Sequence, residues 1–146
     1  MVLAPPPRDQ DGCVVPHDHH EIFDGDRVVR RVSEQFIVNN SDGTRRLSTM
    51  AFQPSSGDNA GLSVDLVDQI MRDGSDAIVH VTSPRWIGSV CLEVSFLRAS
   101  EFMVGYDPLE DNEYHGEIWG SFSKARKKLL ARNSQWFVAI VGVEIC

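Results

Sequence analysis

Residues 26–38, "DRVVRRVSEQFIV", begin the part of the chain in which β-branched and aromatic side chains become frequent. A second segment of this kind, "TRRLSTMAF" at 44–52, follows the residues "NNSDG" at 39–43. Valine, isoleucine and phenylalanine favour strands, whereas asparagine, aspartate and glycine favour tight turns. The two segments are therefore predicted to pair as a β-hairpin.

The residues before this hairpin form a different kind of segment. The stretch "APPPRDQDG" at 4–12 cannot form a helix because its prolines lack amide protons, and the nearby apolar side chains show no sustained period. We expect residues 1–26 to be an extended or disordered arm. Residues 27–146 are then expected to form one domain.

The rest of the chain contains both helical and strand patterns. Helices are predicted over 63–74, capped by Ser63 and ended by Gly74, and over 121–133, capped by Ser121 or Ser123. Alternating or continuous apolar runs predict strands at 76–82, 89–94 and 102–106, and a buried strand over 135–146. The fold class is therefore α+β, with about five to seven short strands and two principal helices.

Composition limits the class of protein. A chain of 146 residues with 42% hydrophobic content fits a single compact domain. No run approaches the roughly 18 apolar residues of a membrane span, and the amino terminus lacks the pattern of a signal peptide, so we expect a cytoplasmic protein. Cys13, Cys91 and Cys146 are far apart and odd in number, which predicts unpaired thiols rather than a disulfide framework or a zinc site.

Charge is unevenly distributed along the sequence. The net charge of -7 argues against general nucleic-acid binding, which needs a basic face. Residues 124–132 nevertheless contain all three lysines and two arginines, while the other residues carry nine basic and twenty-one acidic side chains. This segment could contact nucleic acid locally. We favour the alternative that it pairs with the acidic turn that precedes it.

The segment "HDHHE" at 17–21 has the residue types of a transition-metal site. Adjacent residues cannot all converge on one ion, so a site would need His17 and His19 together with a distant ligand. We favour a polar segment of the arm, and we predict neither a metal nor a cofactor.

Paired arginines suggest an anion site. A strand would direct Arg30 and Arg31 to opposite faces, and Arg45 and Arg46 likewise. If the hairpin forms, one of these arginines could lie beside Ser48 and bind a phosphate or carboxylate. Alternatively, the arginines only neutralise surrounding acids on an exposed sheet.

The stretch "DPLEDNEYHGEIWG" at 107–120 predicts a turn followed by a strand. On that strand His115, Glu117 and Trp119 share one face. A histidine and a carboxylate on one face can act as a general-base pair, because the carboxylate fixes the imidazole tautomer. The alternative is a strand histidine whose ring bonds a nearby loop acid.

The order of "VVRRV", "RRLSTMAF", "LSVDL" and "DPLEDNEYHGEIWG" resembles a type of small bacterial protein with R-R-V, S-x-x-A-F, S-V-D and D-P-x-x-D-N-x-x-H segments. The resemblance covers about residues 28–138 and implies no particular reaction. It marks eight positions, which are Arg30, Arg31, Ser48, Phe52, Ser63, Asp107, Asn112 and His115.

A second, weaker similarity is to ADP-ribosyltransferase-type folds, in which an arginine, a Ser/Thr and a late glutamate bind and cleave NAD. Arg30 or Arg31, Ser48 with Thr49, and Glu117 would take those roles. The short gap between the arginine and "LST" departs from that family, which usually inserts a helix there.

Two functional hypotheses follow. The first is a small binding or interaction protein, an accessory or immunity-like component whose acidic surface meets a basic protein partner. The second is an enzyme or a ligand-binding domain with a small anionic ligand, in a cleft lined by Trp86 or Trp119. Its anion-binding residues would be Arg30, Arg31, Arg46 and Ser48, and its catalytic residues His115 and Glu117.

Overall fold

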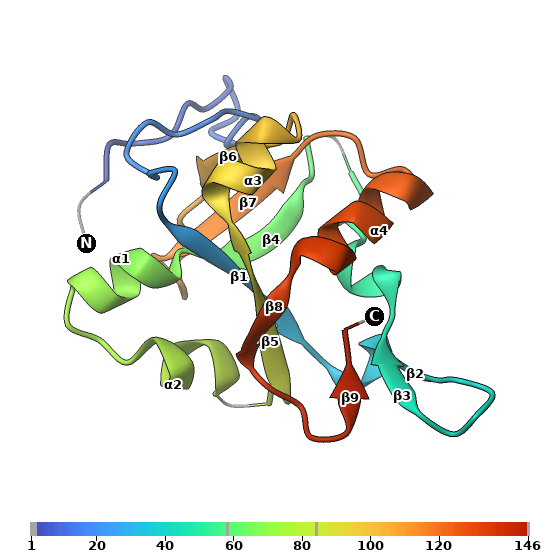
Figure 1. The fold of residues 1–146 in the computed structure, drawn as a ribbon. Coiled ribbons are helices and arrows are strands. Elements are labelled where there is room, and N and C mark those ends of the chain that lie inside the picture. The colour runs from blue at the N-terminus through green and yellow to red at the C-terminus, as the bar shows by residue number, and fades with distance from the viewer. Residues whose placement is uncertain (1–2, 58, 84, 146) are drawn as a thin grey trace.

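The computed structural model describes residues 3–57, 59–83 and 85–145. Within them the chain folds as the predicted α+β domain, with more strands than expected (Figure 1). The strands are β1 (Arg27–Val32), β2 (Ile37–Asn39), β3 (Arg45–Leu47), β4 (Leu62–Asp65), β5 (Gly88–Glu93), β6 (Met103–Tyr106), β7 (His115–Trp119), β8 (Gln135–Val138) and β9 (Val143–Glu144). The helices are α1 (Val67–Arg72), α2 (Ala77–Thr82), α3 (Val94–Ala99) and α4 (Lys124–Asn133), with short 3₁₀ helices η1 (Glu34–Phe36) and η2 (Thr49–Phe52).

A six-stranded sheet with the order β6-β7-β4-β1-β5-β8 forms the centre of the molecule, and all its neighbouring strands are antiparallel. Val28 and Val32 of β1 contribute to the larger hydrophobic core on one face. Val29 contributes to a smaller core on the other face, with residues of α1 and α2. β1 therefore buries valines on both of its faces, although half of its residues are arginines.

Arg30 bridges a gap beside β1. The register of β1 with β5 extends over the whole strand, whereas its register with β4 consists of the single pair Val29↔Asp65. Nε of Arg30 donates to the Ala51 carbonyl at 2.8 Å, and Nη1 donates to the Ser63 carbonyl on β4 at 3.1 Å. The Arg30 guanidinium thus donates hydrogen bonds to two backbone carbonyls at the point where β1 and β4 diverge.

The predicted hairpin is right only in its second half. β2 pairs with β3 across the predicted turn, in which Gly43 adopts a positive φ of +88°. β1 instead joins the large sheet, and η1 separates it from β2. β1 needs a packed layer on each face to bury its valines and pairs along its whole length with β5, and an isolated two-stranded hairpin cannot supply these contacts.

Residues 76–82 were expected to form a strand and instead form α2. The carboxylate of Asp76 accepts a hydrogen bond from the Val79 amide at 3.2 Å and caps the helix. Ala77 and Val81, four residues apart, are buried, whereas Ile78 and Val79 are more than half exposed. The alternation of β-branched residues wrongly predicted a strand. Packing onto the sheet buries residues that are four positions apart, which is the spacing of a helix.

The predicted helix over 63–74 is divided. Its first residues form β4, where Ser63 pairs with Glu117 of β7 rather than capping a helix. α1 covers only Val67–Arg72, and Gly74 follows it with a φ of +81°. Pairing with two neighbouring strands outweighed the local helix signal at 63–65.

The carboxyl-terminal part also differs from expectation. The predicted single strand over 135–146 is two short strands, β8 and β9, joined by a turn in which Gly142 has a φ of +77°. The helix expected over 121–133 is confirmed as α4, and Ser123 caps it through the Arg126 amide.

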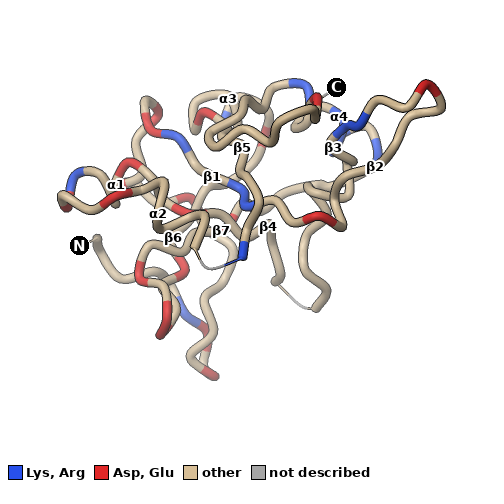
Figure 2. The backbone as a smooth tube through the Cα atoms, turned by 90° about the horizontal axis from the view of Figure 1, so that it is seen from below, with Lys and Arg blue, Asp and Glu red and all other residues tan. Residues whose placement is uncertain are grey.

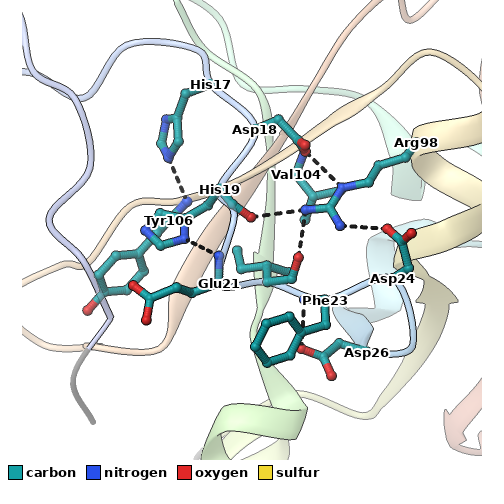
Figure 3. Close-up of polar contacts among 11 residues, drawn as sticks. His17, Asp18, His19, Glu21, Phe23, Asp24, Asp26, Arg98, Val104 and Tyr106 are labelled. Atoms are coloured by element: carbon teal, nitrogen blue, oxygen red, sulfur yellow. Dashed lines mark hydrogen bonds and ion pairs between the residues drawn. The ribbon is translucent and has the colours of Figure 1, made fainter.

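The segment expected to be an extended or disordered arm contains no helix or named strand in its described part, but it packs against the sheet. The His19 amide donates to the Val104 carbonyl, and the Val104 amide donates to Asp18. The Tyr106 amide donates to Nε2 of His17 at 3.1 Å. Residues 17–19 therefore cover the free edge of β6 (Figure 3).

The histidines of "HDHHE" have structural roles here. His17 uses Nδ1 on the Val15 carbonyl at 2.8 Å and Nε2 on Tyr106. His19 donates from Nε2 to the Ala4 carbonyl at 2.8 Å and accepts at Nδ1 from the Glu21 amide. Both ring nitrogens of His17 and of His19 are thus engaged by the protein, so this segment is packed rather than a disordered arm.

Arg98 of α3 organises the end of the arm. Its guanidinium contacts the carboxylates of Asp18 at 3.0 Å and Asp24 at 2.7 Å. It also donates to the carbonyls of His19 and Ile22 at 3.0 and 2.6 Å. Figure 3 shows these groups converging on one side chain. A single arginine therefore holds residues 18–24 against α3.

Two further expectations concern cysteines and membranes. Cys13 is exposed and Cys91 is buried, and both are free thiols, while Cys146 lies outside the described residues. In the described part of the chain, none of the helices combines the length and the apolar character that crossing a membrane requires.

Replacing Arg98 by alanine should release the arm without unfolding the sheet. We expect a loss of about 1–3 kcal/mol, because two buried carbonyls lose a charged donor. Amide hydrogen exchange should accelerate at His19 and Val104 more than in β1. Lys124→Ala, an exposed change on α4, should alter stability by less than about 0.5 kcal/mol. Unchanged exchange at His19 would contradict the proposed anchoring.

Candidate functional site

A pocket of about 480 Å³ opens where the sheet meets α2 and the turn before β7. The turn at 107–114 contributes one wall, and the residues after α2 contribute another. The lining residues are Arg31, Asp65, His80, Ser83, Trp86, Leu109, Asp111, Asn112 and His115. Residues from four separate parts of the chain therefore meet in one cavity.

An ion pair between Arg31 and Asp65 forms the base of this pocket. Nε and Nη2 of Arg31 donate to the two carboxylate oxygens of Asp65 at 2.8 and 2.9 Å. The Asp65 side chain is only 5% exposed and that of Arg31 is 21% exposed. This bidentate geometry fixes both side chains and neutralises the positive charge of Arg31.

Asn112 connects the ion pair to α2. Its Nδ2 donates to Asp65 at 2.9 Å, and its Oδ1 accepts from the Tyr114 amide. The same Oδ1 lies 3.0 Å from Nε2 of His80, so Nε2 carries the proton in this contact. The tautomer leaves Nδ1 of His80 as an acceptor.

Tyr114 anchors the turn to α1. Its hydroxyl donates to the carboxylate of Asp73 at 2.8 Å, and its ring lies edge-on to His80 with centroids 5.4 Å apart. Burial, together with the adjacent Asp73 carboxylate, raises the pKa of Tyr114 to about 12. The phenol thus remains a hydrogen-bond donor, and the turn is held on both helices that cover the smaller core.

His115 is nearly buried and is surrounded by acids. The register of β7 on β4 places His115 and Glu117 on one face, as the sequence predicted. Nδ1 of His115 lies 2.7 Å from the Asp107 carbonyl and 3.3 Å from the Asp107 carboxylate. Nε2 lies 3.9 Å from the Glu117 carboxylate, which is too long for a hydrogen bond. The loop acid Asp107, rather than Glu117, orients the imidazole.

These acids decide the protonation of the site. Burial would lower the pKa of His115, but Asp107 and Glu117 outweigh it, so the pKa is raised above its ordinary value of 6.5. Burial and the Asp107 carboxylate raise the pKa of Glu117, although His115 opposes them. Both groups therefore hold a proton more tightly in the folded protein.

Asp107, His115 and Glu117 also include the residue types of a metal site. One potential ligand atom from each lies within 4.8 Å of the other two. However, Nδ1 is the nitrogen that faces Asp107, and it already contacts the Asp107 carbonyl. Nε2 faces Glu117 on the other side of the ring. The geometry therefore fits an imidazole that is held by Asp107 and flanked by Glu117 better than three ligands around one ion.

The anion site expected from Arg30, Arg31, Arg46 and Ser48 does not assemble. Arg30 contacts backbone carbonyls, and burial lowers its pKa although Glu117 and Asp65 partly oppose this. Arg31 is paired with Asp65. The Ser48 hydroxyl caps η2 by accepting from the Met50 amide at 3.1 Å. Arg46 donates to Asn40 on the small sheet.

The ADP-ribosyltransferase-like arrangement is not assembled in this pocket either. Arg31 lines the pocket, but Ser48 and Glu117 do not, and Thr49 lines a different groove beside α4. Of the two tryptophans expected at a cleft, Trp86 lines the pocket. Trp119 is buried, and its indole donates to the Asn59 carbonyl.

Sequence reasoning missed Asp65 and His80. Asp65 was assigned to a helix that is really β4, and His80 to a strand that is really α2. Asn112 was one of the positions marked by the resemblance in segment order to a type of small bacterial protein. No spacing rule connects these three residues, because antiparallel pairing and the packing of α2 bring them together.

A double-mutant cycle tests the ion pair. Asp65→Asn leaves Arg31 without its counter-charge and should cost about 2–4 kcal/mol of unfolding free energy. Arg31→Gln should cost a similar amount. The double variant should lose about 1–3 kcal/mol less than the sum, as measured by urea unfolding. Strict additivity would show that the two side chains stabilise the fold independently.

Stability should depend on pH through His115. Because the folded pKa is raised, the stabilising contribution is fully present below the ordinary value and is lost as pH rises through the folded value. The stability difference between the wild type and His115→Asn should therefore shrink as the pH rises above the ordinary histidine pKa of about 6.5. Asparagine can still donate to the Asp107 carbonyl, so it is a conservative reference. A constant or growing difference would contradict the raised pKa.

Comparison with known proteins gives no match: no family model, no curated protein and no solved structure matches this chain. Its function has to be inferred from the contacts of the pocket itself.

Proposed function

We propose that the protein is a small binding protein whose pocket receives a lysine or arginine side chain of a basic protein partner. One observation carries this proposal. Among the described residues that line the pocket, Arg31 is the one arginine and is already neutralised by Asp65, while the rim adds the exposed carboxylate of Asp111. A cationic group is therefore favoured over an anionic one.

The surroundings of the pocket support a cationic ligand. The turn that forms its wall carries the carboxylates Asp107, Glu110, Asp111 and Glu113. Asp68 of α1 and Asp73 at its end add acidic positions on the helix to which this turn is anchored, with the basic Arg72 beside them (Figure 2). The negative field would raise the association rate of a basic partner and would weaken as salt increases.

The neutral groups of the pocket suit a long basic side chain. Leu109 is 44% exposed and offers an apolar surface for an aliphatic stem. Trp86 already attracts a guanidinium, because Cζ of Arg85 lies 5.9 Å from its ring centroid. Nδ1 of His80 and the Ser83 hydroxyl provide acceptors for N–H groups.

The proposal includes the setting expected from the sequence, which is an accessory or immunity-like component in a bacterial cytoplasm. The free thiols of Cys13 and Cys91 support a reducing compartment. The order of the sequence segments resembles that of a type of small bacterial protein, and this resemblance supports a bacterial origin.

A second candidate function is acid–base chemistry at His115. The observation that favours it is the orientation of a nearly buried imidazole by Asp107 at the wall of the pocket. His115→Asn distinguishes the two functions: it would abolish turnover in an enzyme, whereas a binding protein would retain most of its affinity.

Titration with a capped tri-arginine peptide tests the binding function. We expect saturable NMR shifts at the Trp86 indole and the Asn112 amide, with affinity falling as salt rises. Asp111→Asn should weaken binding about 2–5-fold by removing one exposed ion pair. Trp86→Ala should weaken it about 2–10-fold by removing the aromatic face.

The matched control is Glu110→Gln, which removes the same charge from the same turn outside the pocket lining. It should change affinity by less than about twofold. If Glu110→Gln weakens binding as much as Asp111→Asn, attraction is a property of the whole acidic turn and the pocket proposal is wrong. Salt-independent binding would also contradict it.

A further inference from the structure

A second groove of about 420 Å³ lies on the small-sheet side of the molecule, between α4 and the segment formed by β3 and η2. Arg46 and Thr49 line it from that segment, and Lys128, Ala131 and Arg132 line it from α4. Lys128 and Arg132 are four residues apart, so they share one face of the helix. We refer to this set of five residues as the basic groove.

The three cations of the basic groove lack carboxylate partners. Within the described ranges, no ion pair involves Arg46, Lys128 or Arg132, and Arg46 contacts only the neutral amide of Asn40, at 2.9 Å. Glu144 is in register with Arg46 on β9 but forms no ion pair with it. The charge of the groove is therefore available to a ligand.

Neighbouring basic residues are used differently. Arg45 pairs with Glu34, Lys127 donates to Gln53, and Arg126 contacts the Ser100 carbonyl and the Phe102 ring. The pairing of α4 with the acidic turn at 107–113, which we favoured from the sequence, is not found in the described part of the chain. The basic segment instead faces η2 and β3 (Figure 2).

Leaving these cations unpaired has an energetic cost. Like charges at i and i+4 destabilise a helix by about 0.2–0.5 kcal/mol, and Arg46 adds a third positive charge at the same groove. A bound anion would offset this repulsion. Phosphate fits this arrangement, because two guanidinium forks and an ammonium can each donate to its oxygens, and the Thr49 hydroxyl can donate as well.

The remaining lining indicates the size of the ligand. Ala131 and the aliphatic stems of the basic side chains provide an apolar floor, which suits the organic part of a small phosphate ester. Proteins that bind single-stranded nucleic acid use aromatic side chains to stack the bases. None of the five described residues that line the basic groove is aromatic, which favours a single small ligand over a polynucleotide.

We propose that the basic groove binds the phosphate group of a small organic phosphate monoester. The site is separate from the acidic pocket and has the opposite charge, so it does not depend on the proposed partner binding. It also gives Arg46 the anion-binding role that the sequence suggested, with α4 rather than Arg30, Arg31 and Ser48 as its companion.

Titration with phenyl phosphate and with inorganic phosphate at low salt tests the proposal. We expect saturable NMR shifts of Thr49 and the Arg46 side chain with both probes, and tighter binding of phenyl phosphate, because its ring contacts the apolar floor. Arg46→Gln, Lys128→Gln and Arg132→Gln should each weaken binding about 3–10-fold, by removing one charge-assisted contact. Asp111→Asn should leave this binding unchanged, which separates it from the acidic pocket.

The control is Lys124→Gln, which removes one charge from the same helix outside the groove and should alter affinity by less than about twofold. Equal weakening by Lys124→Gln and Lys128→Gln would show attraction to a general basic field and overturn the site. A total absence of saturable shifts at about 10 mM phenyl phosphate would also overturn it. If a deoxythymidine decamer binds more tightly than phenyl phosphate and its binding depends on the same three residues, the small-ligand proposal is wrong. The groove would then bind single-stranded nucleic acid.

Discussion

The bidentate ion pair between Arg31 and Asp65 is the contact on which the candidate site depends. It joins β1 to β4 on the face of the sheet that α1 and α2 cover. Asn112 then uses Asp65 as an acceptor, and His80 uses Asn112. Because each partner leaves the next with one defined donor or acceptor, a single carboxylate determines the position of a turn, a helix and the pocket between them.

The two adjacent arginines of β1 show how strand geometry separates similar residues. Arg31 pairs with a carboxylate on one face, whereas Arg30 satisfies the carbonyls of Ala51 and Ser63 where β1 and β4 diverge. Neither guanidinium is available to an anion, although the sequence gives both the same appearance. Both arginines therefore have structural roles, because contacts within the fold already use their hydrogen-bond donors.

The arrangement of charge gives the protein two chemically distinct surfaces. The acidic turn at 107–113 is held on α1 and α2, while the cations of α4 face η2 and β3. A net charge of -7 therefore describes the average and not the local field. The arm adds a third feature, since His17, Asp18 and His19 hydrogen-bond to the backbone of β6 and close its edge against other strands.

Several elements could be predicted from local sequence. The strand at 88–93, the helix capped by Ser123, the turn at 39–43 and the shared face of His115 and Glu117 all follow from propensity, capping or the two-residue period of a strand. Local signals failed at β4 and α2. There the choice between helix and strand depends on which surface is available to cover the sheet.

The sequence by itself determined the α+β class, the uneven distribution of charge and a few residues of the candidate site, such as Arg31, Trp86 and His115. Only the tertiary structure decided which of these residues meet. Asp65, His80, Asn112 and His115 come together through strand register and helix packing. Strand register and helix packing depend on contacts between distant segments, so this information is not present in any one of them.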